Sequence, residues 1–132
     1  MVIRLCRRAK RIGGFMTVIY GIKNCDTMKK AMAWLNDNGV DYLFHDYKKD
    51  KVPANMIDKA INQFGWEVVI NKRGTTWRTL DQEIKDTMDN KRALNIVIEN
   101  PSIIKRPLLN YNEKIYLGFK ENQYRHILKS SI

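Results

Sequence analysis

The sequence has few cysteines and no long hydrophobic run, and these two absences exclude several classes of protein. No uninterrupted apolar stretch approaches the roughly 18 residues that a membrane-spanning helix needs, so we expect no membrane partner. The two cysteines, Cys6 and Cys25, are too few for the disulfide framework of a small secreted domain. With 44% hydrophobic residues the chain is not a disordered or low-complexity protein. We therefore expect a folded protein of the reducing cytoplasm.

The positive charge of the chain is unevenly distributed. The chain has 132 residues, which fits one domain, and its net charge of +10 would ordinarily indicate a nucleic-acid or acidic partner. However, residues 1–15 hold five of the 24 basic residues and no acidic residue, and the remaining basic residues are scattered along the chain among its acidic residues. We therefore do not expect a nucleic-acid partner.

Residues 1–15 form a basic segment with a composition of its own. The segment lacks the apolar core of a secretory signal, and it lacks the serines of an organellar transit peptide. We expect it to be disordered or not native, with Met16 as the functional start and Cys6 as an incidental thiol. An arm that binds nucleic acid or a membrane surface is the alternative.

Hydrophobic spacing predicts a strand–helix–strand unit at the start of the folded part. Residues 17–21 are β-branched and aromatic, as in a buried strand. Residues 26–38 carry Met28, Ala31, Met32 and Leu35 on one helical face. A second strand is predicted over residues 42–47. Such a unit implies two parallel strands joined by a right-handed crossover.

The remainder of the chain predicts a helical stretch and then a hairpin. Pro53 starts a helix that Gly65 ends. Thr75 or Thr76 is expected to cap a short helical piece, and Asn90 to cap a helix over residues 91–99. Two strands over residues 108–111 and 114–119 and a helix over residues 121–128 follow. With the first unit, these elements predict an α/β protein: a four-stranded mixed sheet with a helical insertion between strands two and three. Because a cysteine directly follows strand one, we expect a single thioredoxin-like domain over residues 16–132.

Cys25 is the candidate nucleophile because it lies between the first strand and the first helix. A thiol at a helix N-terminus faces free backbone N–H groups and the positive end of the helix dipole, which both favour the thiolate. Lys23 favours the thiolate further, and Asp26 opposes it. The alternative is a small capping or core residue, because free cysteines are often simply buried.

Three other kinds of cysteine site are excluded, because the residues that each needs beside Cys25 are absent. A C-x-x-C dithiol needs a cysteine at position 28, which is Met28, and a C-x₅-R phosphatase loop needs an arginine at position 31, which is Ala31. The histidines His45 and His126 lie far from Cys25 in the sequence, so we expect no metal site. A disulfide formed by Cys25 must therefore be resolved by another molecule.

The dipeptide Arg106-Pro107 is the second signal. A proline before a strand is often only a start marker, and an arginine there is often only a surface residue. In a thioredoxin-like fold, however, the proline before the third strand is cis and faces the cysteine. We therefore expect Pro107 to leave a backbone edge for a peptide-like substrate, and Arg106 to hold an anion or the thiolate.

Four ordered motifs identify a family. The stretches YGIKNCDTMKKAMAWL, NKRGTTWRTL, IENPSIIKRPLL and YLGFKENQY resemble the arsenate-reductase-like (ArsC/Spx/YffB) family, and most closely its YffB-like subgroup. The resemblance covers residues 16–128. It implies a thioredoxin-like fold and glutathione-dependent thiol chemistry. Glutathione is then the expected co-substrate, glutaredoxin a further partner, and no bound cofactor is expected.

The resemblance also implies roles for single residues. Cys25 matches the catalytic cysteine, Arg106 and Pro107 match the arginine and the cis proline beside it, and Arg73 lies at or near another active-site arginine. Lys120 stands where true arsenate reductases have an arginine, and a lysine lacks the planar fork that binds oxyanions bidentately, so arsenate is not the expected substrate. The expected substrate- or glutathione-binding residues are Lys23, Asn24, Arg73, Arg106, Pro107 and Lys120.

Two functions from different classes follow from the resemblance. The first is an enzyme in which Cys25 attacks an oxidised sulfur or an oxyanion and glutathione resolves the adduct. The second is a protein that, like the Spx branch, binds RNA polymerase and regulates transcription. Spx-type redox sensing uses a C-x-x-C pair, and Met28 removes that pair here, which favours the enzyme.

Overall fold

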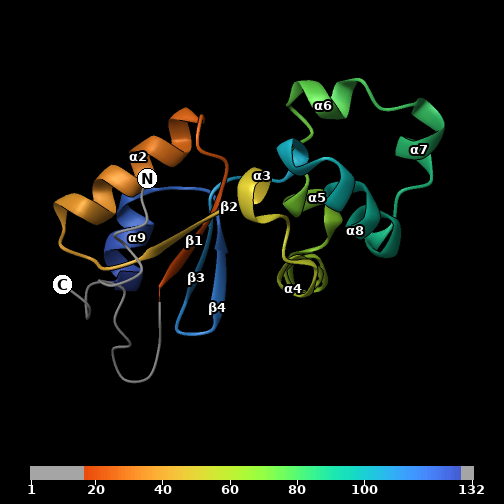
Figure 1. Ribbon diagram of the computed structural model, residues 1–132. Coiled ribbons are helices and arrows are strands. Elements are labelled where there is room, and N and C mark those ends of the chain that lie inside the picture. The colour runs from red at the N-terminus through yellow and green to blue at the C-terminus, as the bar shows by residue number, and fades with distance from the viewer. Residues whose placement is uncertain (1–16, 129–132) are drawn as a thin grey trace. The chain divides into compact units, whose positions relative to one another are not determined.

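The computed structural model describes residues 17–128, which belong to two compact units (Figure 1). The first unit contains residues 17–46 and 106–128, and the second is Tyr47–Lys105. The second unit is thus the segment that the sequence predicts as a helical insertion. The expectations for residues 1–15, including the one for Cys6, lie outside the described residues.

The first unit is built on a four-stranded mixed sheet, as predicted. Its strands are β1 (Val18–Gly21), β2 (Leu43–Asp46), β3 (Leu108–Tyr111) and β4 (Lys114–Leu117), in the order β2-β1-β3-β4. Strand β1 is parallel to β2 and antiparallel to β3, and β3 is antiparallel to β4. This arrangement confirms the thioredoxin-like fold.

Helices α2 (Asp26–Asp37) and α9 (Glu121–Leu128) pack on one face of this sheet (Figure 1). The predicted apolar face of α2 is confirmed, because Met28, Ala31 and Leu35 are completely buried. From α9, Tyr124 inserts its ring against Trp34 of α2, with the ring centroids 5.9 Å apart in an edge-to-face contact. Burial of these apolar and aromatic side chains is the main favourable term in the stability of the unit.

The turn between β3 and β4 is a two-residue hairpin, as expected. Asn112 and Glu113 both have left-handed backbones, with φ of 56° and 63°. Two successive left-handed residues form a type I′ turn, whose twist matches that of the flanking strands. The turn therefore fixes the register in which Tyr111 pairs with Lys114.

The second unit is helical. It contains α3 (Tyr47–Asp50), α4 (Ala54–Phe64), α5 (Trp66–Val69), α6 (Thr75–Arg78), α7 (Gln82–Asp86), α8 (Asn90–Glu99) and the 3₁₀ helix η1 (Pro101–Ile103). Its core lies where α4 packs against α5 and α8, with Ile57 and Ile61 of α4 and Val97 of α8 completely buried. None of the described helices in either unit is long and apolar enough to cross a membrane.

Two predicted helix caps are wrong. Helix α8 is capped by Asp89, whose carboxylate accepts a hydrogen bond from the Arg92 N–H at 2.8 Å. Asn90 is instead the first helical residue, and its Oδ1 accepts a hydrogen bond from the Trp66 N–H at 3.1 Å. Helix α6 is capped by Gly74, which places Thr75 and Thr76 inside its first turn. Both errors are displacements of one or two residues among neighbours that can all act as caps.

We predict that Asp89→Ala lowers the free energy of unfolding by about 1 kcal/mol, because loss of an N-cap side chain costs roughly 0.5–2 kcal/mol. Asp81→Ala is the matched control, since Asp81 precedes α7 as its N-cap residue but makes no capping hydrogen bond. Urea denaturation followed by circular dichroism measures both variants. Equal losses in the two variants would contradict the capping role of Asp89.

Candidate active site around Cys25

Cys25 occupies the turn between β1 and α2. It is the N-cap residue of α2, with an extended backbone (φ −144°, ψ 126°), and its side chain is half-buried. Before it, Ile22 is buried, whereas Lys23 and Asn24 are exposed. The chain thus anchors the turn through an apolar side chain and leaves the thiol at the surface of the unit.

Two opposing effects set the pKa of Cys25, and their balance lowers it from its ordinary value. Burial is the largest single effect and raises the pKa, because a thiolate is poorly solvated there. The Met28 N–H, a hydrogen bond from the Arg106 side chain, the Arg106 charge and the Thr27 N–H all lower the pKa. These donors therefore favour the charged form, which is the nucleophile.

Sheet pairing brings Arg106 to Cys25. Because β1 and β3 are antiparallel, with Tyr20 opposite Leu108, the end of β1 and the start of β3 lie at the same edge of the sheet. Cys25 follows β1 and Arg106 precedes β3. Pro107, which stands between Arg106 and β3, is buried, and the Arg106–Pro107 peptide bond is cis, as predicted.

The other predicted site residues are exposed side chains. Lys23 and Asn24 lie in the turn that leads to Cys25, and Lys120 lies directly before α9. Arg73 belongs to the second unit, in the turn between α5 and α6, where its backbone N–H donates a hydrogen bond to Asn71 Oδ1 at 3.1 Å. A part for Arg73 in the chemistry of Cys25 stays a prediction from the family resemblance.

The histidines lie in ordinary structural positions. His45 is in β2 with its ring centroid 5.1 Å from that of Tyr20, and His126 is exposed on α9. Over residues 17–128, no group of three or more His, Cys, Asp and Glu side chains could hold a metal ion.

The sequence analysis did not identify two residues, Met28 and Gly118, as contributors to the site. Met28 is fully buried against β1, so tightly that a methyl group on Gly21 would lie 2.3 Å from Met28 Sδ. The position of the second cysteine of a C-x-x-C pair is therefore used for packing. Gly118, at the end of β4, donates its N–H to the Pro107 carbonyl at 2.8 Å. The glycine in YLGF, inside the strand predicted over residues 114–119, was the signal that could have identified it, because a glycine within a strand pattern often marks a bend or a close backbone approach.

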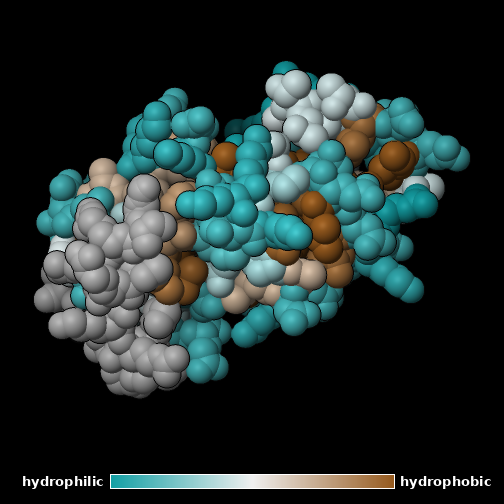
Figure 2. All heavy atoms as spheres, viewed as in Figure 1, coloured by the Kyte–Doolittle hydropathy of each residue, from teal (hydrophilic) through white to brown (hydrophobic). Residues whose placement is uncertain are grey.

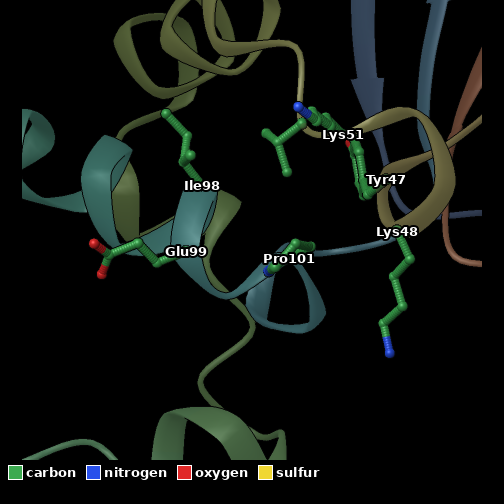
Figure 3. A pocket seen from close by; sticks show the side chains of 7 residues that line it. Tyr47, Lys48, Lys51, Ile98, Glu99 and Pro101 are labelled. Atoms are coloured by element: carbon green, nitrogen blue, oxygen red, sulfur yellow. The ribbon is translucent and has the colours of Figure 1, made fainter.

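The second unit has a cavity of its own, of about 470 Å³. Figure 2 shows patches of apolar surface amid a mostly hydrophilic exterior, and Ile98, which lines the cavity, is 40% exposed. In Figure 3, Ile98 lies across the cavity from Tyr47 and Lys51, whereas the Lys48 ammonium and the Glu99 carboxylate point away from its centre. None of the groups that act on Cys25 lines this cavity.

We predict that Cys25 reacts with iodoacetamide with a pH midpoint below the ordinary thiol value of about 8.5. Burial raises the pKa, but the Met28 and Thr27 N–H groups and Arg106 together lower it by more. Arg106→Ala should therefore raise the midpoint and slow the reaction at pH 7 several-fold, and Lys120→Ala is the control. All variants carry Cys6→Ser so that one thiol is followed. A midpoint unchanged by Arg106→Ala would show that Arg106 does not stabilise the thiolate.

The chain matches a family over most of its length. The ArsC family model matches residues 20–127. An uncharacterized protein of Haemophilus influenzae is 46% identical over 110 residues, which cover 83% of this chain and 96% of that protein. The global transcriptional regulator Spx of Streptococcus mutans is 26% identical over 115 residues, covering 86% of this chain and 83% of the regulator.

A solved structure agrees in fold as well as in sequence. The YFFB protein is 41% identical with a TM-score of 0.80, and the match covers 83% of this chain and 96% of that structure. Since the family model spans most of the residues described above, including Cys25 and Arg106, and a 46% identical relative covers 83% of the chain, the chain belongs to the ArsC family.

Proposed function

We propose that this protein is a glutathione-dependent thiol reductase in which Cys25 is the only catalytic cysteine. The observation that carries the proposal is the environment of Cys25, where backbone N–H groups and Arg106 favour a thiolate at the surface of the unit. Such an environment is typical of reactive cysteines, whereas structural cysteines are buried in apolar surroundings. The buried Met28 at the C-x-x-C position supports resolution by a second molecule.

The proposed reaction transfers glutathione in two exchanges. The Cys25 thiolate attacks the glutathione sulfur of a mixed disulfide RS–SG, which forms a Cys25–SG disulfide and releases RS⁻, which takes a proton. The thiolate of a second glutathione then attacks the glutathione sulfur of that disulfide, which releases oxidised glutathione and restores the Cys25 thiolate. The substrate RS–SG gains two electrons, and two glutathione groups leave as their disulfide.

Arg106 has two parts in this scheme. Its guanidinium stabilises the Cys25 thiolate before attack and again when Cys25 leaves in the second exchange, and a lower pKa makes Cys25 a better leaving group. The exposed side chains of Lys23, Asn24 and Lys120 belong to the same unit as Cys25 and are proposed to bind the carboxylates of glutathione. Glutaredoxin is a further proposed partner, through disulfide exchange at Cys25.

The alternative is a regulator that binds RNA polymerase. The relatives named as Spx, such as the 26% identical protein of Streptococcus mutans, favour this function. A C-x-x-C redox switch is not present at Cys25, because position 28 holds Met28, whose side chain packs against Gly21. Co-purification of RNA polymerase with the protein, together with no thiol turnover, would establish the alternative.

We predict glutathione-dependent turnover of a mixed glutathione disulfide that Cys25→Ser reduces to the uncatalysed background, because the serine hydroxyl does not ionise near neutral pH. Cys6→Ser is the control and should keep full activity. Peroxide and arsenate are tested beside the disulfide, and we expect arsenate to be the poorer substrate because Lys120 lacks the arginine fork. Equal turnover by wild type and Cys25→Ser would reject the proposed enzyme.

We predict that Arg106→Ala lowers kcat/KM for glutathione more than Lys120→Ala does. A hydrogen bond to a charged group contributes about 1.5–3 kcal/mol, equivalent to roughly tenfold or more in rate. Arg106 is half-buried beside the sulfur, whereas Lys120 is exposed, where ion pairs contribute about 0–1 kcal/mol. Equal or negligible losses in both variants would mean that the cationic residues form only a solvated surface.

A further inference from the structure

Gly118 lies directly after strand β4 and is hydrogen-bonded to Pro107, the residue that follows Arg106. Its N–H donates a hydrogen bond to the Pro107 carbonyl at 2.8 Å. The bond continues the β3–β4 ladder by one step beyond the pair Leu108–Leu117. Gly118 therefore contacts the backbone of the segment that places Arg106 beside Cys25, and neither the sequence analysis nor the proposed chemistry gives Gly118 a role.

The bond between Gly118 and Pro107 has no reciprocal partner, for a chemical reason. In a hydrogen-bonded pair of antiparallel residues, each residue normally gives its N–H to the carbonyl of the other. Pro107 has no N–H and cannot return the bond. The Gly118 N–H is consequently the donor on which this last step of the ladder depends.

The backbone of Gly118 is in a region that favours glycine. Its φ is 81°, which side chains other than those of Asn and Asp rarely tolerate. With this turn the chain leaves the strand, and Phe119 then packs against the core cluster that Cys25 also contacts. The Phe119 ring meets that of Tyr124 edge to face, with centroids 4.8 Å apart.

We propose that Gly118 is a positioning residue, whose left-handed backbone and N–H hold the Arg106–Pro107 segment against Cys25. The residue touches neither sulfur nor substrate. It holds the Pro107 carbonyl by a hydrogen bond, and the position of Pro107 in turn sets the position of the Arg106 guanidinium. The proposal rests on the proposed function only in taking Cys25 as the reactive group.

The charges near Cys25 are the same in the variants that test this role. Arg106 faces Cys25 from the segment before β3, Lys23 and Asp26 lie close to Cys25 in its own turn and helix, and Lys120 follows two residues after Gly118. None of them is altered when Gly118 is substituted. A change in the titration of Cys25 then reports a change of position.

The test is the rate of iodoacetamide alkylation of Cys25 against pH, in a Cys6→Ser background. Gly118→Ala should move the midpoint upward and lower the rate at pH 7 by roughly threefold or more, since each unit of pKa changes the thiolate fraction tenfold below the midpoint. Gly118→Asn should stay close to wild type, because asparagine tolerates the left-handed region. This measurement needs no glutathione, so it can fail or succeed independently of the proposed enzyme.

Gly39→Ala is the matched control. Gly39 is also left-handed, with φ of 69°, and a methyl group there would meet no atom within 4 Å. Its substitution imposes a similar backbone strain on the first unit at the C-terminal end of α2. We expect Gly39→Ala to lower stability while leaving the pH midpoint of Cys25 unchanged.

The outcomes separate a positioning role from a structural one. An upward shift in Gly118→Ala, absent from Gly39→Ala and Gly118→Asn, supports the proposal. Equal midpoints in all variants, or equal shifts in Gly118→Ala and Gly39→Ala, overturn it. If Gly118→Ala does not fold, amide hydrogen exchange of the wild-type protein decides. Protection of the Gly118 N–H supports the bond to Pro107, and exchange at the rate of a free amide overturns it.

Discussion

The antiparallel pairing of β1 with β3 is the constraint on which the site depends. It sets Tyr20 opposite Leu108, so the turn that follows β1 and the segment that precedes β3 meet at one edge of the sheet. The first carries Cys25 and the second carries Arg106, although 80 residues separate them along the chain. A shift of register by one residue would exchange the faces of the sheet and separate the thiol from its cation.

Charge and packing act together at the cysteine. Half-burial alone would make Cys25 a poorer nucleophile by raising its pKa, and the N–H groups at the start of α2 and the Arg106 guanidinium reverse that effect. The first turn of the same helix buries the Met28 side chain against Gly21. The Met28 N–H therefore stabilises the thiolate while the Met28 side chain packs in the core. The absence of a second cysteine at position 28 and the well-packed first turn of α2 thus have a common structural cause.

The helical unit is an insertion with a core of its own. It begins at Tyr47, directly after β2, and ends at Lys105, directly before the Arg106–Pro107 segment. Stacked rings of Trp66 and Trp77, with centroids 5.9 Å apart, add to the buried residues of α4 and α8. The chain thus leaves the sheet unit after β2 and re-enters it at Arg106, directly before the strand that pairs with β1.

The sequence by itself determined the elements and the principal residues of the site. The helical spacing of Met28, Ala31 and Leu35 located α2, because burial on one face dictates that period, and β-branched and aromatic composition located β1. The site signals were a cysteine at a strand–helix junction and a proline before a strand. Helix caps shifted by one or two residues, since Asp89 and Asn90 are equally good caps in isolation. Only the tertiary structure decided that Arg106 acts on the thiol and that Gly118 holds its neighbour, because both contacts arise from strand register, which joins residues distant in the chain.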